Sequence, residues 1–291
     1  MTLLTYQVFQ TAANIGSFQK AADILGLTPS AISHAISSME KELGFSVLTR
    51  SKSGIALTNY GEHLLPYVNA VLNSEESLQQ AVAELNGLKQ GKVKIAVFSS
   101  VCTNWLPDIL RSFQKLYSKI TMEVFQGTYD DVYDWIKNGT ADLGFLSVSS
   151  AKDIPIEPLY KDPLLCVLPK NARRDCDSPY MDISEMREHQ FVTQRECTDA
   201  DIQNFLKENS LRIQSNYHVV DDLSTVALVE KGFGICLMPE LVMRDIPYDV
   251  ECYPVYPKTC RIIGLAALHP ELMAPAVRMF YNHVLEHYKW V

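Results

Sequence analysis

The sequence lacks the features of membrane, exported and disulfide-stabilised proteins. Its 291 residues contain no apolar run close to the roughly 18 residues that cross a bilayer. The N-terminus has neither the basic segment nor the small-residue cleavage site of a secretory signal. The seven cysteines lie far apart and include no Cys-x-x-Cys pair, which argues against a zinc site or a dithiol motif. We therefore expect a cytoplasmic protein that needs no metal and no cofactor.

Common enzyme motifs are also missing, because the chain has neither a Gly-x-Ser-x-Gly nucleophile turn nor a phosphate-binding P-loop. One pattern is typical of a zinc peptidase: His283 to His287 read His-Val-Leu-Glu-His, which places both imidazoles on one helix face. No third ligand is evident upstream, so we prefer an ordinary packed helix. The sequence predicts no enzyme, and a metal-dependent hydrolase is kept as an alternative.

A basic balance is absent as well, since the formal net charge is −8. Proteins that bind nucleic acid usually carry a positive surface, so this charge argues at first against DNA. Residues 1–60, however, hold four basic and three acidic side chains, a balance of +1, and the acidic surplus lies downstream. DNA binding by this segment would need dimerisation and groove contacts in addition to charge.

The first part of the chain predicts three short helices followed by a hairpin. Between Leu3 and Leu43 apolar residues recur at helical spacing in three successive stripes. Gly44 is placed to end the third helix. Residues 45–57 then read as two short extended segments around the turn 51–54. The second and third helices have their own start signals: Ser17 and Thr28 can cap them, Pro29 suits a first helical position, and Gly26 allows a tight turn between them.

This arrangement is typical of a winged helix-turn-helix, in which the third helix enters the major groove of DNA. We expect Ala31, Ile32, Ile36 and Met39 to form its buried face, leaving polar side chains free to touch base edges. Basic residues nearby are candidates for phosphate contacts. The predicted DNA-binding residues are Ser17, Lys20, Thr28, Pro29, Ser30, Ser33, His34, Ser37, Arg50 and Lys52.

A long helix is predicted to follow, capped by Thr58 and ending near Leu88. Its apolar residues are spaced alternately by four and three, with Glu75 as an interruption, which is the pattern of a coiled-coil seam. The seam consists of Leu64, Val68, Val71, Leu78, Val82 and Leu85. An exposed seam needs a partner, so we expect a homodimer through this helix. A helix packed on its own domain is the alternative.

Residues 3–61 resemble the DNA-binding region of LysR-type transcriptional regulators. The matching positions are Phe9, Gly16-Ser17-Phe18, Ala21-Ala22, Leu25, Thr28, Ala31-Ile32-Ser33, Ile36, Met39-Glu40, Leu43-Gly44, Arg50, Leu57-Thr58 and Gly61. Three positions depart from the family pattern: Pro29 replaces a frequent glutamine, Met39 a leucine and Leu48 a phenylalanine. The first departure removes one family base contact, whereas the other two only repack apolar positions.

From residue 91 onward strands and helices alternate, which predicts a mainly parallel sheet covered on both faces. We expect strands at 93–98, 121–126, 143–147, 164–168, 191–193, 235–237 and 262–267. The expected helices lie near 104–117, 129–138, 199–209, 222–231 and 274–288.

This region is similar to the effector domain of the same family, which has the fold of type 2 periplasmic binding proteins. The resemblance rests on 93–97, Leu106-Pro107, Phe113, Gly127, Gly139, 141–144 and 229–239. It implies two α/β subdomains joined by strands that cross near 159–163 and 264–268. The fold class is therefore α+β and multidomain. Its parts are a winged helix-turn-helix at 1–60, a dimerisation helix at 61–90, effector subdomain I at 91–162 and 266–291, and subdomain II at 163–265.

A cleft between the two subdomains is the expected effector site, because strand ends and helix N-termini with free N–H groups would meet there. The predicted lining residues are Ser99, Ser100, Thr103, Gly127, Thr128, Thr193 and Gln194. Hydroxyl and amide donors favour a small polar or anionic molecule such as a carboxylate. The alternative is that these hydroxyls only cap helices.

Together these patterns predict a bacterial, sequence-specific transcriptional regulator that binds double-stranded DNA as a homodimer or homotetramer and responds to a small effector. A thiol-based redox sensor is an alternative, because Cys197 follows Arg195 near the expected cleft and a cation can lower a thiol pKa. No second cysteine lies within the next twenty residues, which argues against a disulfide switch. A cytoplasmic solute-binding module would account for residues 92–291 alone.

Overall fold

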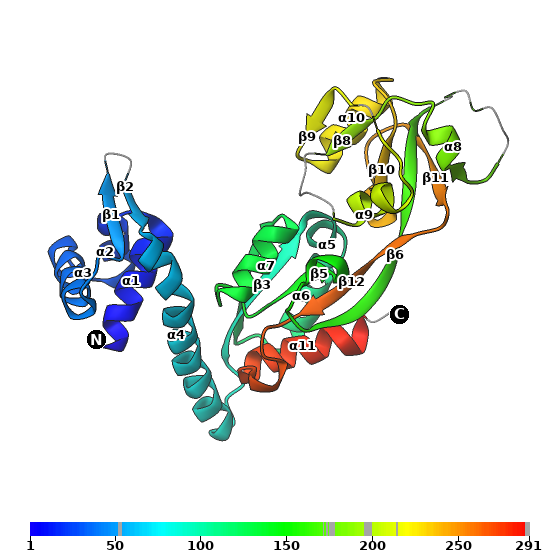
Figure 1. Ribbon diagram of the computed structural model, residues 1–291. Helices are drawn as coiled ribbons and strands as arrows, with labels where there is room; N and C mark the ends of the chain where they lie inside the picture. Colours follow the sequence, from blue (N-terminus) through cyan, green and yellow to red (C-terminus); the bar gives the residue numbers. More distant parts are fainter. Residues whose placement is uncertain are drawn as a thin grey trace. The chain divides into compact units, whose positions relative to one another are not determined.

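The computed structural model describes residues 1–51, 54–170, 172, 174, 178–194, 200–213 and 215–288, without the side chains of Ser51 and Gln194. The chain divides into two compact units (Figure 1). The first contains residues 1–90 with 137–140, and the second contains residues 91–136 and 141–291. Among the described residues, the search for a helix with the length and apolar character to cross a membrane finds no candidate.

The first unit has the predicted three helices, hairpin and long helix. Its elements are α1 (Leu3–Ile15), α2 (Phe18–Leu25), α3 (Pro29–Leu43), β1 (Leu48–Ser51), β2 (Gly54–Leu57) and α4 (Asn59–Leu85). The predicted caps are confirmed: the Ser17 and Thr28 hydroxyls accept from the backbone N–H groups three residues later, and Thr58 caps α4. Gly26 and Gly44 end α2 and α3 in the left-handed conformation.

The hairpin, or wing, is fixed to the helices by hydrogen bonds at its root. The Glu40 carboxylate on α3 accepts from the backbone N–H groups of Val47 at 2.9 Å and Leu48 at 3.3 Å. On the return strand, the Ile55 N–H donates to the Gly16 carbonyl oxygen at 2.9 Å. Gly54 makes this approach possible, because a Cβ there would lie 2.8 Å from the same oxygen. The wing is therefore held against both α3 and the turn that precedes α2.

Helix α4 divides into two parts by what covers its apolar residues. Val68 and Leu72 are buried in the core of the helix-turn-helix, with Leu64 packed against them. Val71, which lies between them, is exposed, as are Leu78, Val82 and Leu85 farther along, Leu78 by 65% and Leu85 by 88%. Leu64 and Val68 of the predicted seam thus pack on their own unit, and the other four seam residues are left uncovered by this chain.

The second unit is built on an eight-stranded sheet in the order β4-β3-β5-β12-β6-β11-β7, with β10 also paired to β6. β3 (Gly91–Phe98), β4 (Ile120–Gly127) and β5 (Leu143–Ser147) are parallel, as predicted. β6 (Ile156–Pro169) and β12 (Cys260–Ala266) pair antiparallel with each other and with their other neighbours. The expectation of a mainly parallel sheet is wrong for these strands. β6 leads from the first subdomain to the second and β12 leads back, so the two strands run in opposite directions.

Strand β6 belongs to both subdomains (Figure 1). Its first half pairs with β12, and its second half pairs with β10 (Cys236–Pro239) and β11 (Val250–Tyr256). β12 pairs with β6 from Cys260 and with β5 from Ile263, so the chain has returned to the first subdomain before the predicted crossing at 264–268. The segment 257–259, which contains Pro257, separates β11 from β12 and marks this return.

Three short strands were not predicted: β7 (Met181–Asp182), β9 (Tyr217–Val219) and β11. β8 (Val192–Gln194) pairs with β9 in a separate parallel pair.

The helices of the second unit are α5 (Ser99–Asn104), α6 (Leu106–Leu116), α7 (Tyr129–Lys137), α8 (Ile183–Met186), α9 (Ala200–Glu208), α10 (Asp222–Glu230) and α11 (Pro275–His287). Short 3₁₀ turns are η1 (Val148–Ser150), η2 (Glu240–Met243) and η3 (Pro270–Leu272). Each subdomain has its own apolar core, and α11 packs into that of the first.

Candidate nucleic-acid interface and effector cavity

The polar face of α3 is open to solvent. Ser30, His34 and Ser37 are exposed, and Ser33 is half-buried. On the other face Ile32, Ile36 and Met39 are buried in the core. Ala31 was expected on the buried face but is exposed, because it lies about 100° around the helix from Ile32, beyond the edge of the apolar stripe. α3 therefore presents short polar side chains and one methyl group near its N-terminus.

Arg50 connects the wing to this face. Its Nη2 donates to the Ser33 hydroxyl at 3.0 Å, and its guanidinium lies 4.7 Å from the centroid of the Phe18 ring. The side chain is exposed, so the remaining N–H groups can reach outward. Lys20 is also exposed, whereas Lys52 lies outside the described residues.

The other predicted DNA-binding residues sit at the helix starts. The Ser17 hydroxyl accepts from the Lys20 N–H at 3.4 Å, and the Thr28 hydroxyl accepts from the Ala31 N–H at 3.2 Å. Thr28 also shares a hydrogen bond of 3.0 Å with the Ser30 hydroxyl. These hydroxyls are used as caps, and Pro29 is exposed beside them.

A cavity of about 660 Å³ lies between the two subdomains of the second unit. One wall comes from the ends of β3 and β4 and the starts of α5 and α7, and the other from the start of α10 and the segment after η2. Five of the predicted effector residues line it, namely Ser99, Ser100, Thr103, Gly127 and Thr128. Its size lies within the range of small-molecule sites.

Thr193, predicted to line the cavity from the second subdomain, is not among its described lining residues. The Thr193 hydroxyl donates to the Tyr217 carbonyl oxygen at 3.2 Å and lies 3.1 Å from His218 Nδ1, so it joins β8 to β9. The Gln194 side chain lies outside the described part of the chain. That wall is formed instead by Val220 to Leu223 and Val242 to Pro247.

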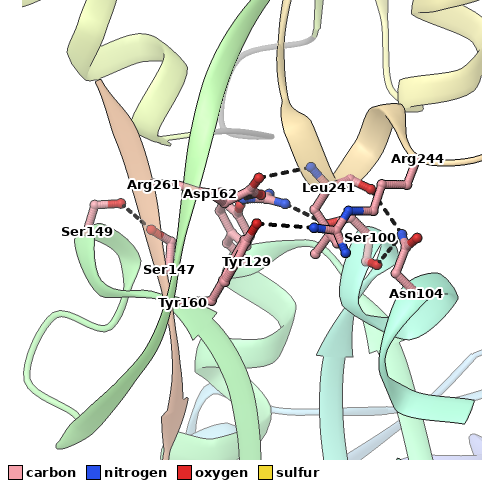
Figure 2. A network of polar contacts seen from close by, with 10 residues as sticks. All are labelled: Ser100, Asn104, Tyr129, Ser147, Ser149, Tyr160, Asp162, Leu241, Arg244 and Arg261. Atoms are coloured by element: carbon pink, nitrogen blue, oxygen red, sulfur yellow. Dashed lines mark hydrogen bonds and ion pairs between the residues drawn. The ribbon is translucent and has the colours of Figure 1, made fainter. Parts of the chain in front are cut away.

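Arg261 is the centre of a buried hydrogen-bond network at one side of the cavity (Figure 2). Its Nε donates to Asp162, its Nη1 to the Tyr129 hydroxyl and its Nη2 to the Ser100 hydroxyl, each at 2.7 Å. Arg261 is 3% exposed and Asp162 is fully buried. Such a pair keeps its charges in a low-dielectric site only because every polar group is bonded.

The same network reaches the second subdomain. The other carboxylate oxygen of Asp162 accepts from the Leu241 N–H at 2.9 Å. The Asn104 side-chain amide donates to the Ser100 carbonyl oxygen at 2.9 Å and to the Leu241 carbonyl oxygen at 3.0 Å (Figure 2). η2 of the second subdomain is thus tied to α5 of the first and to the crossing strands. A change at Ser100 or Tyr129 can therefore alter the contact between the subdomains.

Two of the helix starts around the cavity, those of α7 and α10, are closed by carboxylates, contrary to the expectation of free N–H groups, whereas the start of α5 has no side-chain cap. Asp131 accepts from the Thr128 N–H and hydroxyl, and the Thr128 hydroxyl accepts from the Asp131 N–H, which is a capping box. Asp221 accepts from the N–H groups of Leu223 and Ser224. Side chains at these positions satisfy the donors that an anion would have used.

The described lining residues carry more negative than positive charge. They include the four aspartates Asp131, Asp221, Asp222 and Asp245, against the arginines Arg244 and Arg261. Arg261 is already neutralised by Asp162, which does not line the cavity, and Arg244 donates to the Tyr160 hydroxyl at 3.1 Å. Sequence reasoning missed both arginines and Asp162. Arg261 is the one charged residue of strand 260–266, which was an available signal, whereas strand 156–169 holds Glu157 and Lys161 beside Asp162.

The His-x-x-Glu-His pattern is part of the packing of α11. His283 is 5% exposed, and its Nε2 shares a 2.8 Å hydrogen bond with the Ser112 hydroxyl on α6. Burial and the neighbouring His287 lower the pKa of His283. Among the described residues no group of three or more His, Cys, Asp or Glu side chains is arranged to hold a metal ion. Cys197, the redox candidate, lies outside the described residues.

Comparison with known proteins gives family matches to both parts of the chain. The model described as the bacterial regulatory helix-turn-helix protein of the lysR family matches residues 3–62. The model of the LysR substrate binding domain matches residues 86–289. Over 284 residues the chain is 27% identical to the "Probable HTH-type transcriptional regulator LrrA" of Synechococcus elongatus, covering 97% of this chain and 96% of that protein.

Solved structures share the fold. A variant of full-length OxyR from Pseudomonas aeruginosa is 18% identical with a TM-score of 0.79, covering 98% of this chain and 95% of that chain. Full-length CbnR, solved with its target DNA, is 19% identical with a TM-score of 0.65, covering 98% and 99%. With family models matching most of its length, this chain belongs to the LysR family of DNA-binding transcriptional regulators and carries the family's substrate-binding domain.

Proposed function

We propose that this regulator reads specific base pairs with α3 and phosphates with the wing, under the control of a small polar effector held in the 660 Å³ cavity. The observation that carries the proposal is the solvent-facing side of α3, where Ser30, His34 and Ser37 are exposed while the opposite face is buried. A helix braced in this way can enter a major groove without rearrangement of its own core.

The contacts divide into two classes. Ser30, Ser33, His34 and Ser37, with the Ala31 methyl group, are positioned for base edges, and the serines would also act through bridging water. Lys20, Arg50 and Lys52 contact phosphates, and Ser17, Thr28 and Pro29 place helix starts near the backbone. Because Arg50 already donates to Ser33, it also orients a base-reading side chain.

A gel shift tests this function most simply. The full chain is mixed with the DNA upstream of its own gene and, separately, with random DNA of the same length at one moderate salt concentration. We expect at least about a thousandfold preference for the specific fragment. Equal affinity for the two fragments would contradict sequence-specific recognition.

The charge balance of the cavity bears on the effector's chemistry. With the starts of α7 and α10 capped, Arg261 neutralised by Asp162 and four aspartates in the wall against Arg244, a bare anion such as a carboxylate meets little compensating charge. In the wall, Gln126 Nε2 donates to the Ser99 hydroxyl and the Thr103 hydroxyl donates to the Ser99 carbonyl oxygen, which leaves the Ser99 hydroxyl proton and the Gln126 side-chain oxygen for a ligand. We therefore propose a small polar effector rich in hydroxyl groups, in which any carboxylate is balanced by an amine.

The effector is proposed to act through the Arg261 network. A molecule that contacts Ser100 or Tyr129 competes with, or reinforces, their bonds to Arg261, and η2 is bonded to the same network. Binding would therefore shift the angle between subdomains and with it the spacing of paired DNA-binding units.

A thermal-shift screen tests the effector site. The full chain is heated with neutral polyols, amino acids and dicarboxylates, each at high concentration. A specific ligand present at 100 times its dissociation constant stabilises the fold by about 2.7 kcal/mol. Thr103→Ala should abolish the shift of the active compound, and Thr193→Ala should preserve it, because Thr193 lies outside the cavity wall. A shift lost only in Thr193→Ala would contradict the assignment.

We further propose that the exposed part of the α4 seam joins two copies of the chain, and that dimers associate as tetramers on DNA. Val71, Leu78, Val82 and Leu85 continue the spacing of four and three on an uncovered surface. Leu78→Lys should yield monomers by light scattering, and Leu223→Lys, a change at another exposed leucine, should not.

The proposed domains are the DNA-binding domain at 1–60, the dimerisation helix at 61–90, effector subdomain I at 91–162 with the C-terminal segment, and effector subdomain II from 163 to the return at 257–259. A regulator of this kind acts at the chromosome, in the cytoplasm.

A further inference from the structure

A second cavity, of about 440 Å³, lies within the second subdomain. Within the part of the chain that the structure describes, it shares no lining residue with the cavity between the subdomains. Its wall is formed by the end of α8 with the turn that leads to β8, and by the segment before β9. The described lining residues are Met186, Arg187, Glu188, His189, Gln190, Phe191, Arg212, Ser215 and Asn216.

The two arginines of this wall differ from Arg174 and Arg261 of the same domain. Arg174 is bonded to both carboxylate oxygens of Glu185, and Arg261 has a partner on each of its three nitrogen atoms. Arg187 and Arg212 are exposed, and within the described chain neither guanidinium has a hydrogen-bonding or ion-pairing partner. Two positive groups therefore face one cavity, with Glu188 as the acidic residue of the described wall.

The backbone that carries these side chains is well fixed. The Arg187 N–H donates to the Ile183 carbonyl oxygen and the His189 N–H to that of Met186, both at 3.2 Å. Next to them, the Gln190 carbonyl oxygen accepts from the Ile235 N–H at 2.9 Å. On the other wall the Ser215 hydroxyl donates to the Tyr217 carbonyl oxygen at 2.8 Å. Arg187, His189 and Gln190 thus project from an anchored turn.

We propose that this cavity is a second ligand site, which binds the phosphate or carboxylate group of a small molecule between Arg187 and Arg212. Guanidinium groups match the oxygen pairs of both anions and bind them in a bidentate way. The His189 imidazole and the side-chain amides of Gln190 and Asn216 supply further donors from the same wall. The volume exceeds that of a bare ion and lies within the range of small-molecule sites, so an organic body accompanies the anionic group.

The charge of this cavity is opposite to that of the cavity between the subdomains, where aspartates outnumber arginines. The two sites would therefore select different molecules. The second site does not depend on the proposed effector, since its wall belongs to one subdomain and lacks the Arg261 network.

Isothermal titration of the full chain, without DNA, tests the site with two probes, inorganic phosphate and citrate. We expect saturable binding of at least one probe, weakened about tenfold or more by Arg187→Gln or Arg212→Gln, since a charge-assisted hydrogen bond contributes roughly one factor of ten or more. Arg111→Gln, a change at an exposed arginine on α6, is the matched control and should leave binding unchanged. Binding of phosphate alone would assign a phosphorylated ligand, and binding of citrate alone a carboxylated one.

Two results would overturn the proposal: no saturable binding of either probe, or equal binding by the wild type and both arginine variants. Thr103→Ala separates this site from the effector cavity, because it should leave probe binding intact while removing the effector's thermal shift. Loss of probe binding in Thr103→Ala would place the anion in the cavity between the subdomains and contradict the second site.

Discussion

The recognition helix and the Arg261 network use polar side chains in opposite ways. On α3, Ser30, His34 and Ser37 face solvent, and the bonds around them are confined to the Thr28 and Arg50 contacts. Around Arg261 each guanidinium nitrogen is bonded within the protein, and Asp162 is fully buried. The difference teaches which surface awaits a partner: the polar face of α3 is left open, as the proposed contact with DNA requires, whereas the network is complete by itself and holds two subdomains.

This contrast has an energetic consequence. Exposed polar groups contribute little to folding, so they can be chosen for recognition alone. A buried ion pair is costly to break, because the remaining charge cannot be solvated. Changes on α3 should therefore affect DNA binding without affecting stability, and changes in the network should affect stability first.

The largest expected effect is that of Asp162→Ala. Removing the carboxylate leaves Arg261 buried without its countercharge, and breaking a buried pair costs about 3–5 kcal/mol. Urea unfolding measures the loss. Asp249→Ala removes an exposed partner of Lys170 and should change the midpoint little. Similar losses in the two variants would show that burial does not distinguish the pairs.

The next effect is that of His34→Ala on specific DNA. We expect a loss of about 1–3 kcal/mol on the specific fragment, a smaller loss on random DNA and an unchanged urea midpoint. Gel shifts measure DNA binding and unfolding curves measure stability. Gln114→Ala, a change at an exposed residue of α6, is the control. An equal loss on both DNAs would remove His34 from base recognition.

A smaller effect is expected for Arg50→Gln. A phosphate contact weakens binding to all sequences alike and reduces the slope of log affinity against log salt by about 1. Titrations at several salt concentrations measure that slope. Because Arg50 also donates to Ser33, specificity should fall slightly as well. A wild-type slope in the variant would exclude the phosphate contact.

How well a contact can be predicted from the sequence depends on how far apart in the chain its two residues lie. The caps at Ser17, Thr28 and Thr58 act over three residues, and the structure confirms them. The helix-turn-helix could be predicted because its apolar spacing and its turn residues agree with each other. Ala31 was misassigned because it lies about 100° around the helix from Ile32 and so falls outside the stripe that Ile32, Ile36 and Met39 form.

The effector cavity was predictable on one wall only. Ser99, Ser100, Thr103, Gly127 and Thr128 follow the first two strands, so strand order alone brings them together. The Arg261–Asp162 pair joins residues 99 positions apart, and its meeting depends on where two long strands cross. The opposite wall comes from residues 220–247, equally far along the chain from the first wall. Because β6 and β12 are far apart in the sequence, the alternation of strands and helices did not indicate their antiparallel pairing.

A nuclease footprint of the full chain on the DNA upstream of its own gene tests the central claim most directly. The account predicts two protected half-sites related by a dyad, centred one helical turn of about 10–10.5 base pairs, or a multiple of it, apart. Protection should weaken on both half-sites when His34 is replaced by alanine. Absence of a protected dyad, or an identical footprint with His34→Ala, would contradict recognition by the exposed face of α3.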